Sequence, residues 1–309
     1  TTTYLGSSTG LRLRHVQPAG LVDLVAQDTA TGATAWAGTG LGGAADADLV
    51  AMDERLQARL DRARRRVEPL PGRYEVLLSP SCVADLMLHL YAAAGAQDAL
   101  DGRSPFGRDG GGLRLGERLS PQPLTLRGDP GMPGLECAPF VVARSPDGTA
   151  SVFDTGLALG PTDWISGGTL TALVQTRHSA RLTGAPPTPW IDNLRLEGAP
   201  GGRSLAEMVA GTRRGLLLTS LWYLRPVDPR SLLLTGLTRD GVYLVEDGEI
   251  VGAAHDFRFN ESPLALLERV TEVGRTTRAL PREWGDGFTR TAMPPLRVAD
   301  FALSAVSRW

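Results

Sequence analysis

The sequence contains no lysine, and all 32 of its basic residues are arginine. With abundant alanine and glycine, this pattern is typical of a GC-rich genome and indicates no particular function. The two cysteines, Cys82 and Cys137, are too few for a disulfide framework and too far apart for a C-x-x-C pair. No apolar run reaches the ~18 residues of a membrane span, and no signal segment opens the chain. These absences predict a cytoplasmic protein with no membrane partner.

The composition is that of a folded globular chain without a dominant charge. With 42% hydrophobic and 21% charged residues, the 309 residues can form one large or two ordinary domains. The formal net charge of −2 gives no electrostatic reason to expect nucleic acid as a partner. The basic run at residues 62–66 falls at the end of a predicted helix, where the helix dipole favours cations. We interpret it as a solvated helix face.

The first 70 residues predict strands followed by a helix. Residues 11–37 alternate in polarity, with Thr31-Gly32 as a turn signal. Apolar residues then recur at helical spacing from about residue 48 to residue 67, with Asp46 or Asp48 available as the N-cap. Pro69 and Pro71 end this helix. We interpret residues 1–70 as the C-terminal part of a first α/β domain.

A second helix is predicted after a short strand that begins at Tyr74. Ser79 is a suitable N-cap and Pro80 suits the first helical position. Cys82, Asp85 and His89 share one face of this helix, opposite an apolar stripe. The three could in principle ligate a metal, but they would need a fourth group and suitable geometry. We expect a partly exposed polar face instead.

The rest of the chain predicts an antiparallel α+β fold with a few helices. Residues 95–119 read as a loop, since the glycine cluster at 110–112 lacks the Gly-Lys-Ser/Thr ending of a phosphate-binding loop. Short helices are predicted at the capping box Ser204–Glu207 and at Ser262-Pro263, and Asp247-Gly248 predicts a hairpin. No βαβ rhythm appears. Strands are predicted at residues 124–126, 150–153, 170–174, 191–196, 216–223, 232–237, 242–245 and 250–253.

Several stretches of residues 71–309 together resemble the landmarks of the TldD/PmbA family, in the family's order. They are residues 74–80, 129–134, 153–156, 192–194, 215–219 and 241–250. The family comprises bacterial two-subunit peptide proteases, and the resemblance implies that residues 71–309 form a TldD/PmbA-like C-terminal domain. Relatives carry a further domain ahead of the stretch similar to residues 3–10, so we expect the N-terminal domain to be truncated. Thr1 as a catalytic N-terminal nucleophile is the disfavoured alternative to truncation.

The same resemblance implies a role for residues 89–94. TldD-type subunits carry a His-Glu-x-x-x-His helix and a later Cys that together hold zinc. This chain has His89 at the first position, but Leu90 replaces the glutamate and Ala94 the second histidine, and no cysteine follows Cys137. It therefore resembles the noncatalytic TldE/PmbA type, with no catalytic residue and no metal of its own. The resemblance implies a zinc-bearing TldD-like partner and a peptide substrate held in a chamber between the subunits.

Other chemically attractive residues stay open to two interpretations. Asp154 and Asp192 could orient a peptide, but capping of local turns is favoured. The remaining histidines are scattered without ligand spacing, and four tryptophans are candidates for either an interface or the core. Two competing functions also stay open: a regulatory protein of the DNA gyrase modulator type, and a homodimer with an unrecognised chemistry. The scattered histidines are His15, His178 and His255, and the four tryptophans are Trp190, Trp222, Trp284 and Trp309.

Overall fold

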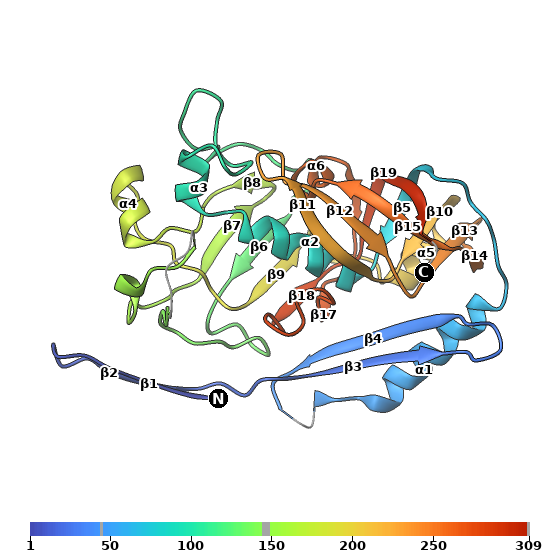
Figure 1. Cartoon of the computed structure of the whole chain (residues 1–309), viewed down its shortest axis with the longest axis horizontal. Helices are drawn as coiled ribbons and strands as arrows, with labels where there is room; N and C mark the ends of the chain where they lie inside the picture. Colours follow the sequence, from blue (N-terminus) through green and yellow to red (C-terminus); the bar gives the residue numbers. More distant parts are fainter. Residues whose placement is uncertain (44–45, 144–148, 308–309) are drawn as a thin grey trace.

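A computed structural model describes residues 1–43, 46–143 and 149–307. Two large sheets enclose a central helix, α2 (Pro80–Ala92), as Figure 1 shows. The predicted α+β class is confirmed, because only the β5–β10 and β9–β18 pairs are parallel among the strand pairs of the described residues. None of the helices in these residues is long and apolar enough to span a bilayer.

The larger sheet has nine strands, in the order β11-β12-β15-β19-β5-β10-β13-β14, with β16 also paired to β19. The long strand β19 therefore joins the two halves of this sheet. Its members are β5 (Gly72–Leu78), β10 (Arg214–Leu218), β11 (Leu221–Asp228), β12 (Leu233–Thr238), β13 (Val242–Glu246), β14 (Glu249–Ala253), β15 (Asp256–Glu261), β16 (Val270–Val273) and β19 (Leu296–Ser307).

The second large sheet has six strands, in the order β17-β18-β9-β6-β7-β8. Short helices lie in the connections around the two sheets (Figure 1). The strands are β6 (Thr125–Gly128), β7 (Thr162–Ser166), β8 (Thr169–Leu170), β9 (Leu194–Glu197), β17 (Thr277–Ala279) and β18 (Thr291–Met293). The helices are α3 (Ala96–Leu100), the 3-10 turn η2 (Val152–Asp154), α4 (Arg177–Thr183), α5 (Leu205–Ala210) and α6 (Pro263–Glu268).

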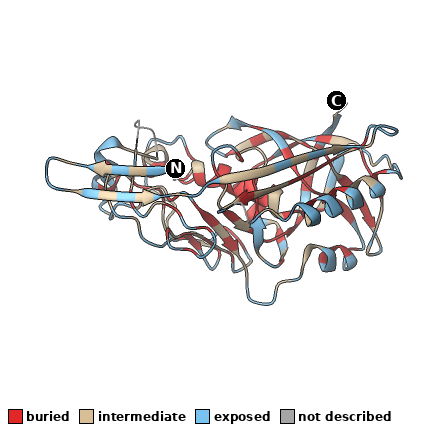
Figure 2. Cartoon of the chain, turned by 90° about the horizontal axis from the view of Figure 1, so that it is seen from below, coloured by how far each residue is buried: buried red, intermediate tan, exposed pale blue. Residues whose placement is uncertain are grey.

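The N-terminal segment forms two separate hairpins and a helix. The first hairpin, β1 (Thr2–Gly6) with β2 (Arg12–Val16), has no fully buried residue and extends along the molecule in Figure 2. The second, β3 (Gly20–Gln27) with β4 (Thr34–Leu41), packs against α1 (Leu49–Ala63). The prediction of strands followed by a helix is confirmed, and the domain boundary at residue 70 stays a prediction.

The α1 helix begins as predicted and ends earlier. Asp48 Oδ1 accepts a hydrogen bond from the Ala51 N–H at 3.0 Å, so Asp48 is the N-cap. The helix stops at Ala63 because the following residues pair with the sheet. Ala253 N–H donates to Arg65 at 2.8 Å, and Val67 N–H donates to Ala253 at 3.0 Å. Strand pairing with the end of β14 thus competes successfully with the last predicted turn.

Several local signals are confirmed. Ser79 Oγ accepts from the Cys82 N–H at the start of α2, and the α5 capping box of Ser204 and Glu207 is complete. Asp247 and Gly248 have φ values of 48° and 85° in the β13–β14 turn. These positive values are what a tight two-residue hairpin requires.

Other element predictions are wrong in detail. Helix α3 interrupts the predicted loop at 95–119, a 3-10 turn replaces the strand predicted at 150–153, and α4 was not predicted. The strand predicted at 170–174 shrinks to β8. The strand predicted at 216–223 is two strands, separated where Ser220 Oγ donates to the Arg239 carbonyl at 2.6 Å.

A polar contact joins β3–β4 to the body of the protein. Arg282 forms an ion pair with Asp240, and Thr34 Oγ1 on β4 donates to the same carboxylate. The Arg282 guanidinium carbon also lies 5.2 Å from the centre of the Trp36 ring and 5.1 Å from that of Trp222. Cation–π contacts of this kind favour arginine because its flat guanidinium stacks on rings.

Candidate functional site

The polar face of α2 is buried, so the prediction of a partly exposed face is wrong. Cys82 and Asp85 are 0% exposed and His89 is 9% exposed. The predicted apolar stripe is only part of the buried surface of α2, because all residues from Cys82 to Tyr91 are buried under the sheets and loops around the helix. Each polar residue on this face therefore needs a hydrogen-bond partner or must be neutral.

Asp85 meets this need through the main chain of a distant loop. Its two oxygens accept hydrogen bonds from the N–H groups of Arg282, at 3.2 Å, and Glu283, at 2.9 Å. Burial nevertheless raises the pKa of Asp85 well above the usual range of an aspartic acid. The Cys82 thiol has a different partner, since its sulfur lies 3.3 Å from the Leu218 carbonyl oxygen. Burial raises the pKa of Cys82 to about 12.

His89 is held against a ring instead of a polar group. It packs edge-to-face on Trp284, with ring centroids 5.1 Å apart and planes at 72°. Its Nε2 is buried and has no hydrogen-bond partner in the part of the chain that the structure describes. Burial lowers the pKa of His89 to about 4, although the charge of Glu283 opposes this shift. The imidazole is therefore neutral at physiological pH.

The side chains of His89, Leu90 and Ala94 do not converge, and α2 ends at Ala92, so Ala94 lies beyond the helix that was expected to carry all three. His89 lines a cavity, whereas Leu90, at 1% exposure, and Ala94, at 5%, lie in the hydrophobic core. One imidazole and two hydrocarbon side chains do not fit a zinc ion, which needs three or four nitrogen, sulfur or oxygen donors. Within the described residues, no group of three or more His, Cys, Asp or Glu side chains could hold a metal ion.

The cavity beside His89, here named the His89 cavity, has a volume of about 560 Å³. This volume falls in the range of roughly 300–1,000 Å³ that ligand pockets span. Its wall is mainly hydrocarbon and aromatic, from Trp284, Leu224, Pro226 and Leu232. Charged residues also line it, but they are already paired: Arg103 with Asp98 at 2.7 Å, and Arg225 with Glu283. The cavity is therefore suited to an apolar group.

Strand β11 forms one side of the His89 cavity and one edge of the large sheet. Trp222 is 40% exposed and Tyr223 is 54% exposed on this strand. Two register shifts and Pro226 interrupt the pairing of β11 with β12. The Tyr223 N–H is also occupied, since it donates to Glu283 at 2.8 Å. Long regular pairing of another strand on this edge is consequently disfavoured.

The other tryptophans have mixed roles. Trp190 stacks on the buried Tyr91, with ring centroids 3.9 Å apart and planes at 17°, which makes it a core contact. Trp284 covers His89, whereas Trp222, which is 40% exposed on β11, packs against the Arg282 guanidinium and is not among the described residues that line the His89 cavity. Trp309 lies outside the described residues.

The remaining candidate histidines and aspartates do not gather at one site. His15 is on β2, where its Nε2 lies 2.8 Å from the side chain of Gln17, just beyond the strand, and His178 is an exposed residue of α4. Asp154 accepts the Arg177 N–H at the start of α4, 3.2 Å away. Asp192 accepts from the indole N–H of Trp190 at 3.0 Å. Neither aspartate forms a described hydrogen bond with the other or with His89.

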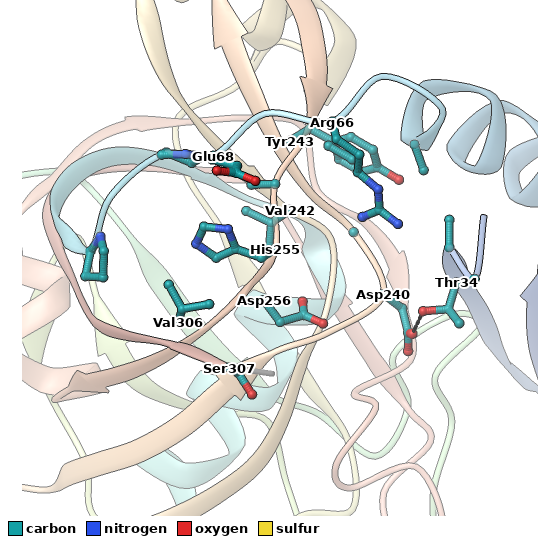
Figure 3. Close-up of a pocket in the computed structure, with 18 of the residues that line it drawn as sticks. Thr34, Arg66, Glu68, Asp240, Val242, Tyr243, His255, Asp256, Val306 and Ser307 are labelled. Atoms are coloured by element: carbon teal, nitrogen blue, oxygen red, sulfur yellow. Dashed lines mark hydrogen bonds between the residues drawn. The ribbon is translucent and has the colours of Figure 1, made fainter. Parts of the chain in front are cut away.

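A further cavity, of about 550 Å³, lies between the connection at residues 66–71 and the ends of β13 and β15 (Figure 3). Asp256 lies there between His255 and Asp240. Burial and the negative charge of Asp240 raise the pKa of Asp256 to about 6, and burial lowers the pKa of His255. We name this cavity, which Asp240 and Asp256 line, the carboxyl cavity.

Sequence reasoning did not find the carboxyl cavity. Asp240 precedes a glycine and Asp256 begins a strand, so each was indistinguishable from a turn residue. The available signal was weak: a polar His255-Asp256 step that follows an apolar strand.

Comparison with known proteins decides the family. A family model described as the PmbA/TldA metallopeptidase C-terminal domain matches residues 71–305. This chain belongs to the PmbA/TldD family. No curated protein matches the sequence significantly.

Solved structures with the PmbA/TldD fold are similar over nearly the whole chain. They include TldE from Thermococcus kodakarensis, at 18% identity and a TM-score of 0.80, and a candidate modulator of a DNA gyrase from Thermotoga maritima, at 19% and 0.79. A candidate modulator of DNA gyrase from Bacteroides thetaiotaomicron has 15% identity and a TM-score of 0.77. The matches cover 98%, 98% and 99% of this chain, but only 67%, 66% and 64% of those proteins. Such identities show the fold alone.

The stretches that carry the PmbA/TldD resemblance contact one another in the structure. Residues 215–219 and 241–250 contribute to the paired strands β10 and β13. The stretch 192–194 contacts the stretch 129–134 through Asn193. The side-chain amide of Asn193 donates to the carbonyl of Asp129, at 2.6 Å, and to that of Leu135, just beyond the stretch, at 2.7 Å. These contacts explain the stretches as structural supports, and they assign none of them to catalysis.

Proposed function

We propose that this chain is a noncatalytic TldE/PmbA-type subunit of a heterodimeric TldD–TldE zinc peptidase of the cytoplasm. One observation carries the proposal: the α2 position that resembles the zinc helix offers a single neutral imidazole, His89, with Leu90 and Ala94 buried in the core. A peptidase of this type needs a metal and a carboxylate that activates water. In this proposal the TldD-like partner supplies both.

The substrate of the assembled enzyme is a peptide or an unfolded segment. This chain helps to enclose it, and the His89 cavity accepts one apolar side chain of the peptide. Support comes from the apolar wall of that cavity and from the fact that β11, which lines it, is an edge strand of the large sheet. Extended peptides often bind by adding a strand to a sheet edge. On β11 such pairing would extend over only a few residues, because Pro226 and the occupied Tyr223 N–H interrupt it.

The decisive experiment measures peptide hydrolysis by this chain alone, by a TldD-like partner alone, and by the mixture, with and without a chelator. We expect activity in the mixture and its loss with the chelator. The His89→Ala variant should keep the kcat of the mixture, since His89 holds no metal, and should change only KM, since His89 lines the cavity that accepts the peptide side chain. Chelator-insensitive hydrolysis by this chain alone would overturn the proposal, as would full activity of the partner without it.

A regulatory function is the second candidate, because two of the similar structures are named as modulators of DNA gyrase. The net charge of −2 disfavours a direct contact with DNA. The two functions separate in a binding titration at rising salt. Non-specific phosphate contacts weaken steeply with salt, so DNA binding or gyrase inhibition that survives moderate salt favours the regulatory candidate.

A further inference from the structure

Four arginines line a cavity of about 300 Å³ at the seam between the N-terminal segment and the body. No aspartate or glutamate is among the described residues that line it. Hydroxyl groups from the start of α2 and from β17 complete the polar part of the wall. The arginines are Arg55 and Arg59 of α1 and Arg275 and Arg278 near β17, and the hydroxyl residues include Ser79, Ser81 and Thr277.

Three of these four arginines have no carboxylate partner among the described residues. The exception is Arg278, which lies 3.6 Å from Asp46. Arg59 is partly buried, and it donates only to the Trp36 carbonyl. Burial lowers the pKa of Arg59, and the like charge of Arg55 adds to this shift. The cavity thus concentrates positive charge that the described residues balance only in part, through Asp46 beside Arg278 and through the charge of Glu207 near Arg275.

Arg59 differs in this respect from three other arginines that are withdrawn from solvent. Arg282 pairs with Asp240, Arg269 pairs with Glu261, and Arg297 pairs with glutamates on two sides. Placing a guanidinium in a low-dielectric site is costly unless an anion is near. A guanidinium that lacks such a partner and lines an open cavity points to a ligand that supplies the anion.

We propose that this cavity, the arginine pocket, binds a small oxyanion, either a phosphate or the carboxylate of a peptide. Guanidinium groups recognise both through paired, charge-assisted hydrogen bonds. The volume suits a group of this size, at the low end of roughly 300–1,000 Å³ for ligand pockets. The first turn of α2, which faces the pocket at Ser79 and Ser81, adds to the positive potential.

The two sources of the oxyanion lead to different biology. A peptide carboxylate would make the arginine pocket a second contact for the substrate, and that part rests on the proposed function. A free phosphate or phosphoryl group would make it an effector site that is independent of hydrolysis. Both can be tested on this chain alone, so failure of the inference leaves the proposed noncatalytic role unchanged.

The experiment is a calorimetric titration at constant ionic strength with three probes: inorganic phosphate, an N-acetylated peptide with a free C-terminal carboxylate, and the same peptide as its C-terminal amide. We expect saturable binding of phosphate or of the carboxylate peptide, and none of the amide. Phosphate without the peptide assigns the effector source, and the carboxylate peptide assigns the substrate source. Equal binding of carboxylate and amide, or no saturation with any probe, would overturn the inference.

Variants locate the binding. Arg275 makes no described side-chain hydrogen bond or ion pair, so Arg275→Gln should fold normally and weaken binding by about tenfold or more, as loss of a charged hydrogen bond implies. Arg62→Gln is the matched control, because Arg62 is exposed on α1 and does not line the pocket. Arg59→Lys tests the deepest position while it keeps a donor for the Trp36 carbonyl. If Arg275→Gln and Arg59→Lys both bind like Arg62→Gln, the site lies elsewhere and the inference is wrong.

Discussion

Asp85 accepts a hydrogen bond from the main-chain N–H of Glu283, 198 residues further along the chain and 2.9 Å away. This contact fixes the loop that carries Arg282, Glu283 and Trp284. Arg282 holds Asp240, Glu283 holds Arg225, and Trp284 covers His89. A single buried carboxyl group therefore helps to hold three side chains that contact β11, α2 and the turn between β12 and β13.

The first prediction follows from this relationship. Asp85→Ala should destabilise the protein by about 2 to 6 kcal/mol, because it leaves the N–H groups of Arg282 and Glu283 without acceptors, at roughly 1–3 kcal/mol each. Asp85→Asn keeps one acceptor and should lose less. Urea unfolding at pH 7 measures both. Asp61→Ala on the exposed face of α1 is the control, and a value for Asp85→Ala equal to this control would contradict the assigned role of Asp85.

The second prediction concerns acid stability and His89. The pKa of His89 is lowered from 6.5 to about 4 in the folded protein, so the unfolded chain binds more protons between these values. The stability contribution of the neutral imidazole is complete above pH 6.5 and is lost as the pH falls towards 4, to a maximum of about 3 kcal/mol. His89→Leu should flatten the stability profile in this window. An unchanged slope in the variant would show that His89 does not titrate as described.

The third prediction concerns Asp256, whose titration destabilises the folded protein as the pH rises, opposite to the effect of His89. The pKa of Asp256 is raised from 3.8 to about 6, so the folded protein favours its protonated form. This contribution is complete below pH 3.8 and is lost as the pH rises through 6. Asp256→Asn should therefore stabilise the protein at pH 7.5 by about 1 to 3 kcal/mol and should have little effect at pH 4. The lower end of this range allows for solvent screening of a partly exposed carboxyl group. Thermal melts at both pH values measure it, and destabilisation at pH 7.5 would refute the prediction.

The fourth prediction concerns the thiols. Cys82 is 0% exposed and Cys137 is 3% exposed, and burial raises the pKa of each to about 12. Only the thiolate reacts readily with alkylating reagents. At pH 8 the native protein should react far more slowly than the urea-unfolded protein, in which both thiols should react. Mass spectrometry after iodoacetamide treatment gives the count, and rapid labelling of the native protein would contradict the burial of these residues.

Local signals in the sequence predicted local structure well. Asp48, Ser79 and the Ser204 capping box begin helices where expected, since each cap depends on residues only three positions away. The Asp247-Gly248 turn follows for the same reason. The end of α1 was not predictable in this way, because it depends on pairing with Ala253, almost two hundred residues later.

The site was harder to predict than the fold. Spacing correctly placed Cys82, Asp85 and His89 on one face of α2, but polar side chains ordinarily indicate an exposed face. Their partners, such as the Glu283 N–H, come from a loop that no local pattern connects to α2. The proximity of Asp240 and Asp256 likewise results from the sheet order, and the sequence carries no periodic signal for it.

The enclosure of α2 also bears on how this chain can evolve. A change of Leu90 to glutamate would place a carboxylate in a site with 1% exposure, and a change of Ala94 to histidine would force a ring into a space that now holds one methyl group. Each substitution alone lowers stability before it confers any metal affinity. The path from this sequence to a metal-binding helix therefore passes through single variants that are less stable than the present protein.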